Sequence, residues 1–172
     1  LELEVRINRL SFPSKGPRFV CSQNNNQIRS IEINPKTRTL RQLRRYSMTG
    51  FGKMSPDGRW VLGKDSSQDL AIFDANLGIR EKRFPSHLRD GNIPNGIFSS
   101  DSRRVYLARN GGIITIDLET MQSRMVLDEF PSSAIHGMVR AENGLMALVG
   151  ANPAAIVVWD SKTNRVVATK RG

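Results

Sequence analysis

Arginine and lysine side chains are the groups in this sequence whose clustering most directly suggests chemistry. Two clusters stand out along the chain, and their members are Arg38, Arg41, Arg44, Arg45, Arg80, Lys82 and Arg83. Guanidinium groups bind carboxylates and phosphates bidentately, and Tyr46 could stack beside the first cluster. We therefore expect a contact for acidic protein side chains or for nucleic-acid phosphates. Arginine on both faces of an extended segment is also typical of an outer strand that resists edge pairing, and this alternative stays open.

Outside the two basic clusters, the sequence shows no pattern of residues that is typical of a catalytic or metal-binding site. His87 and His136 are expected in links between structural units, without the converging partners that a metal or general base needs. Asp65, Asp69 and Asp74 lack the glycine and the terminal glutamate of an EF-hand loop. We therefore expect a protein that is not an enzyme and that carries no metal or cofactor.

The composition of the chain indicates its class of partner and its cellular compartment. The 172 residues carry a formal net charge of +10, which favours acidic partners such as nucleic acid or acidic protein surfaces. Cys21 is the single cysteine, so an internal disulfide is excluded, and we expect a reducing, cytoplasmic compartment. Cys21 lies within a predicted strand. No apolar run is long enough to span a membrane, and the alternating start from Leu1 reads as a strand. Because that start lacks methionine, we expect a piece of a longer chain.

A repeat is visible when the ends of four apolar segments are compared. Ile33-Asn34, Phe73-Asp74, Ile116-Asp117 and Trp159-Asp160 follow one another at intervals of 40, 43 and 43 residues. A period near 43 residues is the length of one four-stranded propeller blade. Asparagine or aspartate at a strand end can accept backbone N–H bonds from the next turn, so we expect a structural role for these residues.

Turn signals keep almost the same period. They are Ser14-Lys15-Gly16, Pro56-Asp57-Gly58, Ser100-Asp101-Ser102 and Glu142-Asn143-Gly144, each between two strand candidates. The apolar runs Leu70–Phe73, Ile113–Ile116 and Ile156–Trp159 are typical of strands covered on both faces. The sequence thus predicts an all-β chain of about four repeats, with approximate bounds 1–45, 46–88, 89–131 and 132–172. Together the repeats are expected to form a single structural segment that spans residues 1–172.

Two stretches carry a family resemblance. Ser55-Pro56-Asp57-Gly58-Arg59 with Ile72-Phe73-Asp74, and Val157-Val158-Trp159-Asp160, resemble the blade signature of WD-repeat β-propellers. The Gly-His pair that starts a blade in that family is missing, so its histidine network is not carried over. Ile31-Glu32-Ile33-Asn34-Pro35 is similar to YVTN-type propellers. The resemblance implies four-stranded antiparallel blades in an incomplete ring, with the missing blades on this polypeptide or another.

The functional expectation follows from this resemblance and from the lack of catalytic patterns. We expect a non-catalytic β-propeller scaffold that mediates protein–protein interaction within a larger protein or complex. Two alternatives remain: a nucleic-acid or ribonucleoprotein scaffold that uses basic blade edges, and a fragment of an enzymatic propeller of the lactonase or quinoprotein type.

Overall fold

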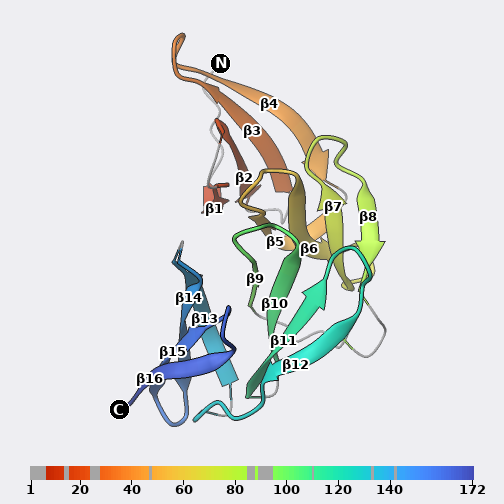
Figure 1. Cartoon of the computed structure of the whole chain (residues 1–172). Helices are drawn as coiled ribbons and strands as arrows, with labels where there is room; N and C mark the ends of the chain where they lie inside the picture. The colour runs from red at the N-terminus through yellow and green to blue at the C-terminus, as the bar shows by residue number, and fades with distance from the viewer. Residues whose placement is uncertain are drawn as a thin grey trace. The chain divides into compact units, whose positions relative to one another are not determined.

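The computed structural model describes residues 7–13, 16–23, 28–46, 48–84, 88, 95–109, 111–132, 134–141 and 143–172. Within these residues the chain forms sixteen β-strands and no α-helix. The strands make four antiparallel sheets of four strands, and in every sheet the strands that are neighbours in sequence are hydrogen-bonded neighbours (Figure 1). The prediction of an all-β chain with four-stranded antiparallel sheets is therefore confirmed.

The first compact unit, residues 1–91, contains two of the sheets. Sheet A consists of β1 (Ile7–Ser11), β2 (Arg18–Gln23), β3 (Ile28–Asn34) and β4 (Thr39–Tyr46). Sheet B consists of β5 (Met48–Met54), β6 (Trp60–Asp65), β7 (Leu70–Asp74) and β8 (Arg80–Arg83). In both sheets the last strand in sequence lies at the sheet edge.

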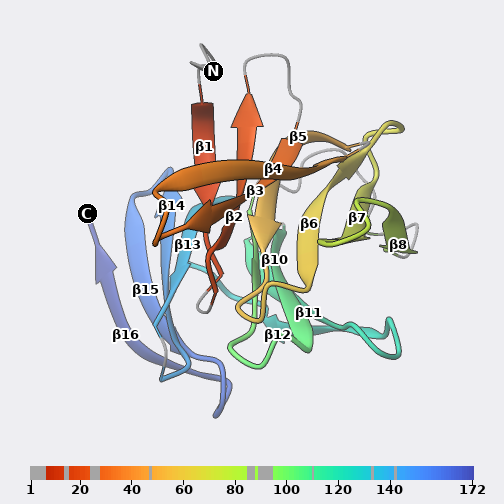
Figure 2. The same ribbon diagram turned by 90° about the horizontal axis from the view of Figure 1, so that it is seen from above.

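The second compact unit, residues 92–172, contains the other two sheets. Sheet C consists of β9 (Gly96–Phe98), β10 (Arg104–Arg109), β11 (Gly112–Asp117) and β12 (Ser123–Leu127). Sheet D consists of β13 (Ala134–Arg140), β14 (Leu145–Ala151), β15 (Ala155–Asp160) and β16 (Arg165–Arg171), in that order across the sheet (Figure 2).

The third strand of every sheet ends on the repeated asparagine or aspartate. Asn34, Asp74 and Asp117 each accept two backbone N–H bonds from the turn that follows, and Asp160 accepts one from Lys162, at 2.7–3.3 Å. These bonds close the turn locally, which is why the same residue types recur there. The expected structural role of the repeated strand-end residue is confirmed.

The turn between the first and second strands also repeats its geometry. In sheet B, the amide of Trp60 donates to Ser55 Oγ at 2.9 Å and the amide of Arg59 donates to Asp57 at 3.0 Å. The equivalent turn of sheet C has the same two bonds, from Arg104 to Ser99 and from Arg103 to Asp101. Positive φ falls at one position in each of these turns, namely Gly16, Gly58, Ser102 and Gly144.

Sheets A and B pack on each other through an apolar core. The core combines Val20, Ile28 and Tyr46 of sheet A with Met54, Val61 and Phe73 of sheet B. Tyr46 meets Phe73 edge-on, with ring centroids 6.4 Å apart, and its hydroxyl donates to the carbonyl of Ala75 at 3.0 Å. Strand β5 lies close to sheet A at Gly52, where an added Cβ would stand 3.2 Å from Val20 and Ile28.

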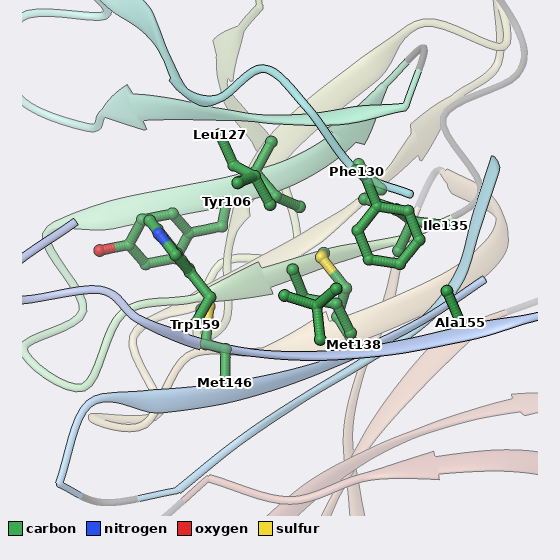
Figure 3. Close-up of a cluster of buried hydrophobic side chains, with 12 residues drawn as sticks. Tyr106, Leu127, Phe130, Ile135, Met138, Met146, Ala155 and Trp159 are labelled. Carbon is green, nitrogen blue, oxygen red and sulfur yellow. The ribbon is translucent and has the colours of Figure 1, made fainter. Parts of the chain in front are cut away.

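Sheets C and D share a second core (Figure 3). Tyr106 of β10 and the fully buried Trp159 of β15 meet edge-on, with ring centroids 5.5 Å apart. The same core includes Leu127, Phe130, Ile135, Met138, Met146 and Ala155. Phe130 and Ser132 lie so close to Gly150 that a Cβ added there would come within 2.4 Å of the Phe130 ring and 2.7 Å of the Ser132 Cβ. This approach requires glycine at position 150.

One sequence expectation about the apolar runs is wrong. Strands β7 and β11 are buried almost throughout, as predicted for strands covered on both faces. Strand β15 instead alternates buried and exposed residues, and Ile156 is 48% exposed. Its outward face has no layer against it in the described part of the chain, so the run Ile156–Trp159 is covered on one face only.

Candidate functional site

The first predicted basic cluster lies along β4, the edge strand of sheet A, with one exception. Arg38 precedes the strand and occupies a turn position with φ of 55°, so it is not part of the extended segment that the sequence predicted for this cluster. The side chain of Arg44 lies outside the described residues. Arg45 is exposed and stands opposite Arg29 of β3.

Arg41 is held by a carboxylate of its own sheet. Its guanidinium group donates to Glu32 of β3 at 2.7 Å, and Arg18 of β2 stands 3.6 Å from the same carboxylate. The hydrogen bond from Arg41 lowers the pKa of Glu32. Arg41 is 72% exposed, so this pair is a surface ion pair with a small effect on stability. A partner that binds Arg41 must compete with Glu32.

The second predicted cluster, on β8, surrounds the buried carboxylate of Asp65. Arg80 donates to Asp65 Oδ2 at 2.6 Å and Arg83 stands 3.5 Å from the same oxygen, while Lys82 is half-buried on the strand between them. Asp65 Oδ1 accepts the amides of Ser67 and Asp69 at 2.9 and 3.2 Å. Both oxygens of this carboxylate are therefore saturated.

Asp65 remains ionised despite its burial. Burial by itself would raise the pKa of this carboxyl, but the hydrogen bonds from Arg80 and from the turn amides, with the charge of Arg83, hold the pKa below its ordinary value. Arg80 and Arg83 thus join β8 to the end of β6. The predicted partner-binding role of the seven basic residues stays a prediction, and three of them have a structural partner inside their own sheet.

The other polar residues considered from the sequence lie at separate places in the fold, as far as the structure describes them. His136 lies exposed within β13, not in a link between units as expected, because β13 begins at Ala134. His87 lies outside the described residues. Cys21 is buried in β2, as expected, and burial raises the pKa of its thiol. In the part of the chain that the structure describes, no group of three or more His, Cys, Asp or Glu side chains could hold a metal ion.

A polar hollow on sheet C is the feature that sequence reasoning missed. Its volume is about 400 Å³, and its lining includes Arg104, Thr115, Asp117, Ser123 and Arg124. Thr115 is 5% exposed and lies in the middle of the apolar run of β11. The sequence signal that could have predicted the hollow is Thr115, a hydroxyl residue inside an otherwise apolar strand. Such a residue needs a polar neighbour when it is buried.

An open apolar face on sheet D is the second unpredicted feature. Val139, Val149 and Ile156 are 64%, 44% and 48% exposed, and Val149 stands directly opposite Ile156 in the β14–β15 ladder. On the other face of the same strands, Leu148 and Val157 are buried in the core with sheet C. Sheet D is thus apolar on both faces and covered on one.

Comparisons with known proteins add no assignment. No protein-family model matches the chain, and no curated protein matches it significantly. Among the described residues, no helix meets the length and hydropathy needed to cross a membrane.

Proposed function

We propose that the four sheets are blades of a WD-repeat-like β-propeller and that the chain is a non-catalytic scaffold for protein–protein interaction. The repeated local geometry supports the blade assignment. Every sheet is a four-stranded meander with the same two turn types, and its third strand ends on a capping Asn or Asp. A four-stranded meander of this length is the repeating unit of propellers.

The open face of sheet D is the observation that carries the interaction role. Apolar residues stand in two cross-strand rows on this face, and their members are Val139, Ala147, Val158 and Ala168 in one row and Val149 and Ile156 in the other. Exposed apolar surface of this continuity is typical of protein interaction sites. A further four-stranded sheet is the occupant that fits, because the corresponding strands of sheet C are buried almost throughout.

The arrangement of charges supports a protein partner over nucleic acid. Arg41, Arg80 and Arg83 have carboxylate partners inside their own sheets, which offsets part of the positive charge of the outer strands. Nucleic-acid binding would rest on phosphate contacts and would weaken steeply with salt. Association through an apolar face changes little with salt, so a salt series separates the two roles.

Sedimentation velocity tests the interaction role. The purified 172-residue chain is expected to self-associate through sheet D when no further sheet covers it. The double variant Val149→Lys/Ile156→Lys is expected to be monomeric with an unchanged circular dichroism spectrum, because both side chains already face solvent. Leu40→Lys is the matched control, since Leu40 is 60% exposed on β4 and its replacement should leave association intact. A wild-type chain that stays monomeric at every concentration would contradict the proposal.

A further inference from the structure

The hollow on sheet C combines the guanidinium groups of Arg104 and Arg124 with the buried hydroxyl of Thr115. Arg104 of β10 stands opposite Asp117 of β11, and Arg124 of β12 stands opposite Thr115 of β11. Residues 115 and 117 are two apart on one strand, so all four side chains project from the same face of the sheet. The hollow therefore has a cation on each side, with the Thr115 hydroxyl and the Asp117 carboxylate between them.

Within the described residues, the guanidinium groups of Arg104 and Arg124 make no salt bridge, and both side chains are exposed at the hollow. One oxygen of the nearby Asp117 carboxylate, Oδ1, is occupied, because it accepts the amides of Glu119 and Thr120 at 2.9 and 3.0 Å and the Thr120 hydroxyl at 3.2 Å. The hydrogen bond from the Thr120 amide is the largest cause of the lowered pKa of Asp117, and the positive charge of Arg104 lowers this pKa further.

Thr115 supplies the second, independent sign of a ligand. Its hydroxyl oxygen is buried at the hollow and has no hydrogen-bond partner among the described residues. A buried hydroxyl without a hydrogen-bond partner lowers the stability of the fold. The presence of such a hydroxyl in an apolar strand therefore needs an explanation. A hydroxyl can donate to an oxyanion that both arginines attract.

The size and lining of the hollow define the ligand class. A volume of about 400 Å³ accommodates a side chain with its attached backbone and exceeds what a single small ion fills. Small-molecule pockets of similar size are lined mainly by apolar groups, whereas every residue that lines this hollow is polar or charged, with two arginines and one aspartate. An acidic side chain on a peptide segment satisfies both observations.

We propose that the hollow on sheet C binds the oxyanion of an acidic peptide side chain between Arg104 and Arg124, with the Thr115 hydroxyl as a third donor. The inference deepens the proposed interaction role, because it names the chemistry of one partner contact. It does not involve the open face of sheet D, so the two can fail separately.

Titration of the 172-residue chain followed by amide NMR tests the site. Three five-residue peptides differ only in the central residue, which is glutamate, phosphoserine or glutamine. Both charged peptides are expected to shift the amide signals of Thr115 and Ser123 to saturation, and the glutamine peptide is not. The tighter of the two charged peptides identifies the source of the oxyanion as a carboxylate or a phosphate monoester.

Variants separate a specific site from general charge attraction. Arg104→Gln and Arg124→Gln are each expected to weaken binding about tenfold, the value of one charge-assisted hydrogen bond. Arg103→Gln is the matched control, because it removes the same charge next to Arg104 without touching the lining, and a change of about twofold or less is expected. Thr115→Val should weaken binding without lowering the melting temperature, because it removes a hydroxyl that has no partner in the fold.

Three results would overturn the proposal. They are no saturable shift with either charged peptide at millimolar concentration, equal binding of the glutamine peptide, and an equal loss in Arg103→Gln. Self-association of the chain measured in parallel distinguishes failure of this site from failure of the scaffold role.

Discussion

Asp65 shows how one residue type serves different purposes along this chain. Asp74, Asp117 and Asp160 cap local turns at strand ends and remain partly exposed. Asp65 makes the same kind of contact to the amides of Ser67 and Asp69, and in addition its second oxygen is bound by arginines from β8. The local contacts follow from sequence, whereas the arginine contacts depend on the sheet.

Removal of the Asp65 charge is expected to destabilise the chain. Asp65→Asn keeps an acceptor for the turn amides but loses the charge-assisted bonds to Arg80 and Arg83, a loss of about 1.5 to 3 kcal/mol in the free energy of unfolding. Urea denaturation followed by circular dichroism measures it. Glu32→Gln is the comparison, since its carboxylate pairs with the exposed Arg41, and a smaller effect is expected there. An equal effect of the two substitutions would mean that burial of Asp65 does not strengthen its pairs.

The pH dependence of stability follows from the same contacts. Asp65 has a pKa in the folded chain below its ordinary value, so between the folded and unfolded values the unfolded state binds more protons. The contribution is fully present above the unfolded pKa of about 3.9 and is lost as pH falls through the folded value. Melting temperatures measured from pH 6 to pH 2 should therefore fall less steeply below about pH 4 in Asp65→Asn than in the wild type. Parallel curves would assign the acid sensitivity to other carboxyls.

At the level of elements, the turn between the third and fourth strands repeats more strictly in conformation than in sequence. The residue four positions after the strand-ending Asn or Asp has positive φ in every sheet, and these residues are Arg38, Gly78, Met121 and Asn164. Glycine and asparagine adopt this conformation at low cost, whereas a long side chain is strained there. Two of the four turns, those with Arg38 and Met121, thus carry a local backbone strain.

Replacement of the strained residue should stabilise its turn. Met121→Asn is expected to raise the free energy of unfolding by about 0.5 to 1 kcal/mol, because asparagine tolerates the left-handed region that methionine avoids. Thermal denaturation measures the gain. Glu119→Asn, in the same turn but without positive φ, controls for the asparagine itself and should give no gain. If Met121→Asn lowers the melting temperature, another contact of the methionine side chain outweighs the backbone strain.

At the scale of the whole chain, the two compact units each contain one tryptophan. Trp60 in β6 is half-buried, with the guanidinium group of Arg59 4.4 Å from its ring centroid. Trp159 is fully buried in the core of sheets C and D, against Tyr106. The second unit therefore depends on its tryptophan for packing far more than the first.

Truncation of Trp159 should be strongly destabilising. Trp159→Ala is expected to cost about 3 to 5 kcal/mol in the free energy of unfolding, because it leaves a cavity beside Tyr106 and Met146. Denaturation followed by far-ultraviolet circular dichroism measures the cost, and Trp60 fluorescence then reports the first unit alone. Trp60→Ala is the matched variant and should cost less. An unchanged melting temperature in Trp159→Ala would be incompatible with the core described.

The strand and turn pattern could be predicted from sequence because short-range chemistry decides it. A strand-ending Asp74 or Asp160 finds its donors two or three residues further on, and Gly58 supplies the conformation that its turn needs. The polar hollow could not be predicted in this way. Arg104, Thr115 and Arg124 come from three strands, and only the cross-strand register places them on one face.

Whether both faces of an apolar strand are covered was decided by the tertiary structure. The runs Leu70–Phe73 and Ile156–Trp159 look equivalent in sequence, and both form the third strand of a sheet ending on aspartate. Yet Ile72 is 1% exposed and Ile156 is 48% exposed. The difference arises because an apolar side chain is buried only when another layer packs against its face, and that layer comes from residues distant in sequence. The sequence by itself determined the strands, their turns and their order; the tertiary structure decided which faces are covered and which charges are paired.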